Sequence, residues 1–392
     1  MQEMPVRVLV AGSYVIDDGY PNVKWLLRAM EKDGRFSMAY AGGGHEKRQH
    51  FSTEAGSVLK LIGQGLRTMF RACREVIVVL KRKKFGPAFD VLFVPYPSLP
   101  ILLLLSLLPR QYRPRIVADA FISIYDTVVN DRKMLDERSF LASLLRRVEK
   151  RALHAANVVL TDTECNRRFL EQIFLLPADR VQALPLATDE HHYLPVPYDA
   201  ADGDCTVLFV GTFVPLHGVE TIARAMLLLE REPGIRFRVF GNGQAADVMN
   251  EVLRNGECKL EWRREWVGPE NLAREVENAD ICLGIFGTTA KAARVWPLKN
   301  YTAMRIGRAI VSESTECMPG LGSKKGELPV CMVPAGDAGA LADALLCLAR
   351  NPGERVRMAD AARCHYRDHM SNEKVLDGLY RVMCGLADQS GI

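Results

Sequence analysis

The stretch ADICLGIFGTTAKAARVWPLKNYTAMRIGRAIVS, residues 279–312, decides the fold and points to a site. Its apolar run 281–286 is followed by a Gly-Thr-Thr loop, a helix-like segment and a second apolar run. Parallel α/β sheets place such a loop and helix N-terminus at the carboxyl edge of the strands. Three cations, Lys291, Arg294 and Lys299, follow the loop, where backbone N–H groups and the helix dipole favour an anion. The stretch alone fits a phosphate site and an ordinary connection with solvated cations equally well.

The same alternation of apolar runs and helical segments extends over the whole chain. Residues 6–11, 116–118, 206–210 and 235–240 have the apolar, β-branched composition of buried strands. The alternation stops at 191–203, which contains Pro and Asp, lacks periodicity and is typical of a linker. We therefore predict an α/β protein with two Rossmann-like parallel α/β domains facing each other across a cleft.

Composition narrows the class of protein. Of the 392 residues, 48% are hydrophobic and 25% charged, as in soluble globular chains. No apolar run approaches the roughly 20 residues of a spanning helix, and the first residues lack the apolar core of a signal peptide. The cysteines form no CxxC pair and no zinc-like spacing with histidine. We expect a cytoplasmic protein with no metal and no cofactor.

Positive charge concentrates in one segment of the first half. Residues 60–84 hold eight Lys or Arg and one acid, Glu75, with apolar residues at helical spacing, after a Gly-rich basic loop at 42–52. Such a helix is a solvated face, a nucleic-acid patch or a surface that touches anionic lipid. We expect no nucleic-acid partner, because no aromatic residues interleave with the cations. The apolar and Arg-rich residues 99–115 are buried core or a second part of a membrane contact.

Several candidate binding residues follow predicted strands in the first half. Gly12 follows the first strand, Asp119 follows another, and Tyr125, Asp126 and Arg132 lie in the segment after it. Because the carboxyl ends of parallel strands meet at one edge of a sheet, these residues are candidates for binding an acceptor.

Glycine-bearing loops follow predicted strands in the second half. Gly211 and Gly218 bracket a loop of the kind that cradles phosphate, although no P-loop lysine follows. Gly241 begins a Gly-Asn-Gly turn that lacks a full dinucleotide fingerprint, and Thr288 lies in the loop of the opening stretch. We count Gly241 and Thr288 among the donor-binding candidates.

The segments VLFVGTFVPLHGVETIARAM, IRFRVFGNGQ, WVGPENLAREVENADICLGIFG and KAARVWPLKNYTAMRIGRAIV, in this order, resemble the C-terminal domain of the retaining glycosyltransferases of family 4, which have the GT-B fold. DGYPNVKWLLRAM and DAFISIYDTVVNDRK resemble a bacterial subgroup of that family. The resemblance implies a hexosyltransferase-type enzyme that retains configuration and needs no metal. Residues 205–392 would bind a nucleotide sugar and residues 1–195 the acceptor, with the last helix able to pack back on the first domain. The acceptor would be a glycan or lipid-linked glycan of envelope or exopolysaccharide synthesis.

The resemblance also assigns donor-binding residues. Gly211, Thr212 and His217 would form the first phosphate loop, and Val267 would contact the base through its backbone. His217 replaces the lysine usual in the wider family, and its pKa should rise beside a diphosphate.

Arg294 and Thr302 occupy the two Glu positions of the family's Glu, seven residues, Glu motif, and Lys299 matches a lysine of the bacterial subgroup. A leaving diphosphate gains negative charge, so Arg294 and Lys299 are predicted to be catalytic, while Lys291 is expected to be solvated. Thr302 should weaken donor binding about tenfold relative to a charged partner. Asp119 stands where many relatives have an acceptor-side His and is the third catalytic candidate.

Two other classes of function stay open. A sugar epimerase of the GT-B type would use carboxylate and His groups as acid and base, which the cations of 291–299 fit less well. A degenerate relative that binds glycan or a partner transferase is suggested by Arg294 and Thr302, where the family motif is broken.

Overall fold

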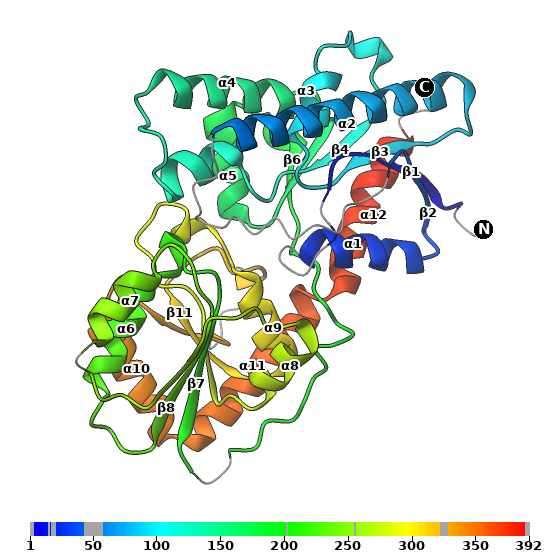
Figure 1. The fold of residues 1–392 in the computed structure, drawn as a ribbon. Helices are drawn as coiled ribbons and strands as arrows, with labels where there is room; N and C mark the ends of the chain where they lie inside the picture. The colour runs from blue at the N-terminus through cyan, green and yellow to red at the C-terminus, as the bar shows by residue number, and fades with distance from the viewer. Residues whose placement is uncertain are drawn as a thin grey trace. The chain divides into compact units, whose positions relative to one another are not determined.

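The structure is a computed structural model. It describes residues 4–388 except 15, 17–20, 43–57, 201–202, 255 and 322–327, and it leaves the side chains of 58–66 undescribed. The chain forms two compact units, one made of Met1–Val129, Lys133–Ala187 and Asn372–Ile392, the other of Asn130–Arg132 and Thr188–Ser371 (Figure 1). Each unit contains a six-stranded sheet in which the paired strands are parallel. The predicted pair of parallel α/β domains is confirmed.

The first unit has the strand order β2-β1-β3-β4-β5-β6. Its strands are β1 (Val6–Val10), β2 (Phe36–Tyr40), β3 (Val91–Val94), β4 (Ile116–Asp119), β5 (Val158–Thr161) and β6 (Val181–Ala183). Its helices are α1 (Pro21–Lys32), α2 (Val58–Phe85), α3 (Leu99–Leu105), α4 (Phe140–Leu153), α5 (Glu164–Phe174) and α12 (Asn372–Asp388). All residues of β3, β4 and β5 are buried, which explains why these strands are continuous apolar runs in the sequence.

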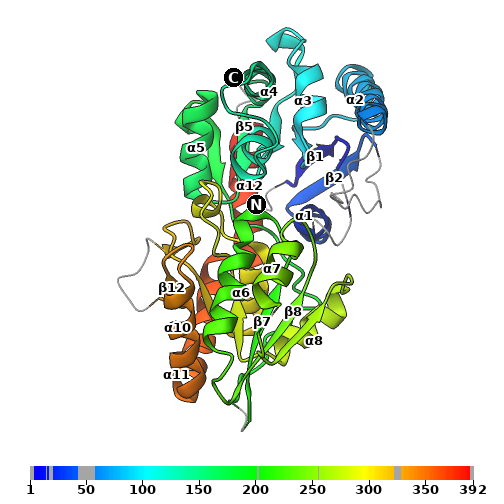
Figure 2. The same ribbon diagram turned by 60° about the vertical axis from the view of Figure 1, so that its left-hand side comes forward.

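Helices cover both faces of this sheet (Figure 2). Alternate residues of β1 face opposite ways, so that Leu9 packs with α2 and α3 while Val8 and Val10 pack with α1 and α12. The edge strand β2 was not predicted, because only Phe36 of its five residues is buried and the alternation is weak.

The second unit has the strand order β12-β11-β10-β7-β8-β9. Its strands are β7 (Cys205–Val210), β8 (Ile235–Phe240), β9 (Leu260–Arg263), β10 (Ile281–Leu283), β11 (Ala309–Glu313) and β12 (Cys331–Val333). Its helices are α6 (Val219–Leu228), α7 (Ala246–Leu253), α8 (Pro269–Glu277), α9 (Leu298–Ile306), α10 (Ala338–Arg350) and α11 (Pro352–His369). The direction of strand succession reverses between β7 and β10, and in doubly wound sheets ligands bind at such a switch point.

The second unit begins at Thr188, within the predicted domain 1–195. The last helix, α12, which was expected to be able to pack back on the first domain, is part of the first unit. Residues Asn130–Arg132 are grouped with the second unit, whereas Tyr125 and Asp126 belong to the first.

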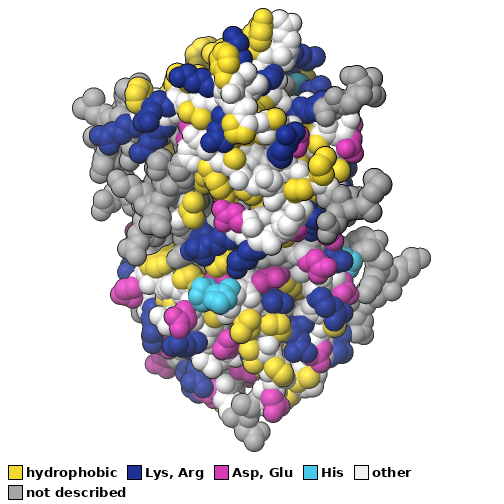
Figure 3. Space-filling model, turned by 90° about the vertical axis from the view of Figure 1, so that its right-hand side faces the viewer, with side chains coloured by type: hydrophobic (Ala, Val, Ile, Leu, Met, Phe, Trp, Pro, Cys, Tyr) yellow, Lys and Arg dark blue, Asp and Glu magenta, His cyan; other side chains and the backbone are white. Residues whose placement is uncertain are grey.

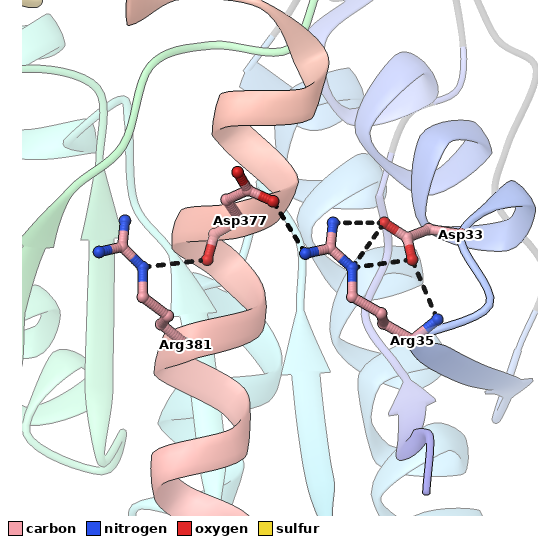
Figure 4. Close-up of polar contacts among 4 residues, drawn as sticks. All are labelled: Asp33, Arg35, Asp377 and Arg381. Atoms are coloured by element: carbon pink, nitrogen blue, oxygen red, sulfur yellow. Dashed lines mark hydrogen bonds and ion pairs between the residues drawn. The ribbon is translucent and has the colours of Figure 1, made fainter. Parts of the chain in front are cut away.

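One basic side chain ties α12 to the rest of the first unit (Figure 4). The Arg35 guanidinium donates to Asp33 through Nη2 (2.6 Å) and to Asp377 of α12 through Nη1 (2.8 Å). It also lies 5.3 Å from the ring centroid of Tyr380, another α12 residue. In contrast, Arg381 donates to the Asp377 carbonyl within α12 itself (3.2 Å).

Arg35→Ala should lower the free energy of local opening of α12 by about 1 kcal/mol, because it removes a partly exposed ion pair and a cation–π contact. Hydrogen exchange of the α12 amides measures this as a lower opening free energy. Arg381→Ala, which removes a charge from the same helix but no contact with another element, should change it by less than about 0.5 kcal/mol. Equal effects of the two substitutions would contradict the tether.

Candidate active site

Two loops interlock at the switch point of the second sheet. The loop after β7 (Gly211–Gly218) receives two backbone hydrogen bonds from the loop after β10: Phe286 N–H donates to the His217 carbonyl (3.2 Å) and Gly287 N–H to the Leu216 carbonyl (3.1 Å). Gly218 has φ +63°, and a Cβ there would overlap the backbone of Phe286. Glycine at this position therefore allows the two loops to approach.

The loop after β8 joins them on the other side of β7. Phe213 N–H donates to the Asn242 carbonyl (3.0 Å), and Gly211 N–H donates to the Phe240 carbonyl (3.0 Å). Gly241 has φ +150°, and a Cβ there would overlap the Gly211 carbonyl. The donor candidates Gly211 and Gly241 are thus brought into direct contact.

Two cationic or titratable side chains converge above Gly211. A Cβ built on Gly211 would lie 2.7 Å from His217 Cε1 and 3.0 Å from Lys299 Nζ. Lys299 reaches this point from the first turn of α9, where its Nζ lies 3.3 Å from the Gly284 carbonyl and 4.1 Å from the Phe209 ring centroid. The absence of a side chain at Gly211 leaves room for both groups.

The electrostatic state of this group follows from its burial. Burial lowers the pKa of Lys299 well below its usual value. Burial, and next the Lys299 charge, lower the pKa of His217 well below its usual value, against a hydrogen bond to the Thr212 backbone. The pKa of His217 is thus depressed in the protein alone, and the rise expected beside a diphosphate stays a prediction. Its buried Nδ1 has no hydrogen-bond partner among the described residues.

The Lys299 ammonium and the His217 imidazole form a place where an anion can bind. Each side chain has hydrogen-bonding ability that the described residues do not fully satisfy, and burying such groups costs free energy. An anionic oxygen would restore the Lys299 pKa and accept from His217, so the arrangement suits a phosphate oxygen.

The other candidates of the opening stretch have separate environments. Lys291 was expected to be solvated, but it is 8% exposed, so this expectation is wrong. Arg294 lies in a short 3₁₀ turn, and its Nη1 donates to the Ala290 carbonyl (2.7 Å). Thr288 is exposed at the same edge, beside the Cβ position of Gly336.

Thr302 is buried one turn after Lys299, and its Oγ1 donates to the Leu298 carbonyl (3.3 Å). Both Thr302 and Lys299 line a shallow, otherwise apolar pocket between the sheet, α8 and α9. Val267 lies in the loop between β9 and α8, and Thr212 is exposed in the loop after β7.

The acceptor candidates of the first unit fall into separate places along its edge. Asp119 is buried at the end of β4 and lines a pocket with Asn22 and Thr161. Burial first, and the nearby Asp162 carboxylate among the smaller causes, raise the pKa of Asp119 to about 7. Gly12 lies two residues after the end of β1, and a Cβ there would contact Val94 of β3.

Tyr125 and Asp126 are buried at the start of a short π-helix (Asp126–Asp131). The predicted basic loop at 42–52 lies, except for residue 42, outside the described residues.

Three buried glutamates were missed by sequence reasoning. Glu75 and Glu149 bind backbone N–H groups of edge loops, and Glu313 ends β11 with neither carboxylate oxygen hydrogen-bonded among the described residues. Burial raises the pKa of Glu313 to about 8. Only Glu75 had a local signal, because it is the one acid in a cationic segment.

Within the described ranges, no group of three or more His, Cys, Asp or Glu side chains is placed to hold a metal ion. The predicted independence of metal stays a prediction.

Comparison with known proteins gives the class of the second unit. Residues 204–351 match the family model of glycosyl transferases group 1. No curated protein matches the chain. The matched residues lie within the second unit and run from β7 to α10.

Solved structures share the two-domain architecture of the whole chain. Sucrose-phosphate synthase from Thermosynechococcus elongatus is similar with a TM-score of 0.65 and 15% identity, over 97% of this chain and 99% of that one. HepE from Anabaena, solved with UDP and glucose, has a TM-score of 0.65 and 11% identity over 96% and 99%. TarM from S. aureus has a TM-score of 0.57 and 12% identity over 79% and 59%. The GT-B fold is confirmed.

Gly211→Ala tests the convergence above the switch point. The added methyl group would press on His217 and Lys299, which should cost about 1–3 kcal/mol of stability and weaken binding of UDP or another nucleoside diphosphate about tenfold. Urea denaturation and calorimetric titration measure the two effects. Gly353→Ala is the control, because its added Cβ meets nothing within 4 Å. Unchanged nucleotide affinity in Gly211→Ala would contradict the assignment.

Proposed function

We propose that this protein is a retaining glycosyltransferase of family 4 that moves a sugar from a nucleotide-sugar donor to a glycan or lipid-linked acceptor. One observation carries the proposal: Lys299 and His217 converge on Gly211 at the switch point of a group 1 glycosyltransferase domain. The resemblance of the opening stretch to the family supports it. The UDP named with HepE supports a nucleoside diphosphate as the donor's leaving group.

Each residue of the group then has a task in the reaction. As the glycosidic bond breaks, negative charge grows on the β-phosphate oxygens, and a preorganised Lys299 ammonium stabilises it. His217 donates a hydrogen bond from its otherwise unpartnered Nδ1 to the same diphosphate. Arg294 supplies a second cation that is able to hold phosphate by two hydrogen bonds.

The pocket beside Lys299 suits the nucleoside. Its walls are apolar except for Lys299 and Thr302, so it offers a face for the ribose and base next to the diphosphate group. In this proposal the Thr302 hydroxyl replaces the charged ribose partner of the family, and the backbone near Val267 contacts the base. The proposed reaction needs no metal, because the cations of the chain take over charge stabilisation.

On the acceptor side, we propose that Asp119 contacts the incoming hydroxyl. Its pKa of about 7 gives it both protonation states near neutral pH, as a general base requires. The buried Thr302 favours one other candidate, a degenerate relative that binds glycan or a partner transferase. That candidate predicts no nucleotide binding.

Lys299→Met should raise stability and weaken nucleotide binding at once. The folded protein lowers the pKa of Lys299 below its unfolded value, so the protonated lysine costs its full amount of stability below the folded pKa, and this cost shrinks as the pH rises from the folded toward the unfolded pKa. Thermal unfolding should therefore show a gain in melting temperature that is larger at pH 6 than at pH 9.

The same substitution should weaken nucleoside diphosphate binding about tenfold to a hundredfold, the value of a charged hydrogen bond. Calorimetric titration with UDP, GDP, ADP and TDP measures it. Lys299→Arg, which keeps the charge, should lose less affinity. A Lys299→Met protein that is less stable and binds as tightly would overturn the role.

We further propose that helices α2 and α4 of the first unit dock on an anionic membrane. Among the described residues, no helix is long and apolar enough to cross a bilayer. Large apolar side chains nevertheless stand exposed on both helices, among them Phe70 (67%), Phe85 (79%) and Phe140 (74%). The upper part of Figure 3 shows Lys and Arg side chains beside exposed hydrophobic ones on one face of the first unit.

This docking surface comprises exposed cations and apolar residues of α2 and α4: Arg67, Phe70, Arg71, Arg74, Ile77, Lys81, Lys84, Phe85, Phe140, Leu141 and Leu144. The predicted contact through 99–115 is reduced in this proposal, because Ile101, Leu102 and Leu105 of α3 are buried. Lys83 is left out because its Nζ donates to the Arg113 carbonyl (2.7 Å).

Reversing Arg74, Lys81 and Lys84 to Glu should lower partitioning onto vesicles containing phosphatidylserine about a hundredfold or more, at about 1 kcal/mol per lost cation. Co-sedimentation with and without the anionic lipid measures the loss. The matched control reverses Arg231, Arg236 and Arg254, three exposed cations of the second unit. Equal losses in the two triple variants would show that net charge, and not the docking surface, governs binding.

A further inference from the structure

Two buried glutamates connect the helices of the docking surface to loops at the carboxyl edge of the first sheet. Glu149 of α4 is 4% exposed and Glu75 of α2 is 7% exposed. Each carboxylate accepts hydrogen bonds from the backbone of a loop that carries acceptor candidates. Buried carboxylates are uncommon unless they are bonded, so these two have a specific task in the unit.

Glu149 uses both of its oxygens. Oε1 accepts from the Ile124 N–H (3.0 Å) and Oε2 from the Tyr125 N–H (2.8 Å). These N–H groups open the helical segment that continues into the π-helix Asp126–Asp131. Free N–H groups at the start of a helix favour a negative partner. The next N–H, of Asp126, donates to Ser123 Oγ (3.1 Å), which completes the cap.

The segment held by Glu149 needs such support. π-Helices are rare and short because their geometry is less favourable than that of an α-helix. Where they occur, they are frequently at functional sites. Ile124 and Glu149 also line a small pocket with Tyr96, Pro97 and Ser98 of the loop after β3. Glu149 thus sets one wall of a pocket at the edge where parallel sheets bind ligands.

Glu75 performs the same task for the loop after β1, with one oxygen. Oε2 accepts from the Gly12 N–H (2.5 Å), where Gly12 has φ +131°. A Cβ at Gly42, just after β2, would lie 2.7 Å from Glu75 Oε1. Glycine at both positions allows the first residues of the two loops to approach the Glu75 carboxylate closely.

We propose that Glu149 and Glu75 are positioning residues that hold the two acceptor loops in their binding geometry. The proposal rests on the proposed glycosyltransferase function and adds residues that the family resemblance did not assign. It predicts different effects on the two substrates: acceptor binding depends on these glutamates, and donor binding in the second unit does not.

The two glutamates should respond differently to glutamine. At position 149 both oxygens accept, so the amide nitrogen of Glu149→Gln would face an N–H donor and the cap would be lost. At position 75 one oxygen accepts, so Glu75→Gln can turn its amide oxygen toward Gly12 and keep the bond, while Glu75→Ala cannot. This contrast identifies hydrogen bonding, rather than volume or charge, as the cause.

Hydrogen exchange of the intact chain tests the loop-holding step. Peptides spanning residues 121–131 should exchange about tenfold faster in Glu149→Gln, in line with a lost charged hydrogen bond. Glu75→Gln should leave exchange of the peptide spanning residues 7–14 unchanged, and Glu75→Ala should speed it. The control Glu171→Gln removes a partly exposed carboxylate that pairs with Arg167 on α5. Unchanged exchange in Glu149→Gln overturns the proposal whether or not the chain is a transferase.

Kinetics test the positioning step. With the donor sugar that the wild-type chain uses, Glu149→Gln should raise the acceptor KM about tenfold, while the UDP affinity measured by calorimetry stays unchanged. Faster exchange with an unchanged acceptor KM would reduce Glu149 to a structural role and overturn the proposal. If the wild-type chain binds no nucleotide, the proposed function fails, and the role in acceptor positioning falls with it.

Discussion

The hydrogen-bonded contact between the loops after β7 and β10 is the constraint on which the second unit depends. Strand order reverses between these strands, and the two loops that diverge there are joined by the N–H groups of Phe286 and Gly287. Gly218 permits this contact because a larger residue would overlap the backbone of Phe286. The joined loops then present Gly211 beneath the side chains of His217 and Lys299. The sequence stretch 279–312 is therefore significant because of the loop that it meets as well as for its cations.

A protonated Lys299 or His217 beside Gly211 lowers the stability of the folded protein. Burial lowers the pKa values of Lys299 and His217, so both groups are destabilised in their protonated forms. A bound diphosphate would remove this loss of stability, and the free energy recovered in this way would strengthen its binding. The first unit uses buried acids in a complementary way, since Glu75 and Glu149 satisfy loop N–H groups while Asp119, with a pKa of about 7, has one oxygen that no described residue bonds.

The fold could be predicted because apolar periodicity and glycine placement are local properties. The predicted strands 206–210 and 235–240 agree with β7 and β8 to within one residue, whereas the edge strand β2 has too few buried residues to leave a pattern. Side-chain environment depends on distant residues, so Lys291 was wrongly expected to be solvated. For the same reason no sequence pattern indicates that burial, and next the Lys299 charge, depress the pKa of His217, or that Glu149 caps Ile124 and Tyr125.

The central claim is that the second unit binds a nucleoside diphosphate where the loops after β7 and β10 meet. Calorimetric titration of the wild-type chain with UDP, GDP, ADP and TDP tests it most directly. The account predicts one-to-one binding of at least one of them in the micromolar range, with affinity that falls when Gly211 or Lys299 is substituted. No binding of any of the four, or binding that both substitutions leave unchanged, would contradict it.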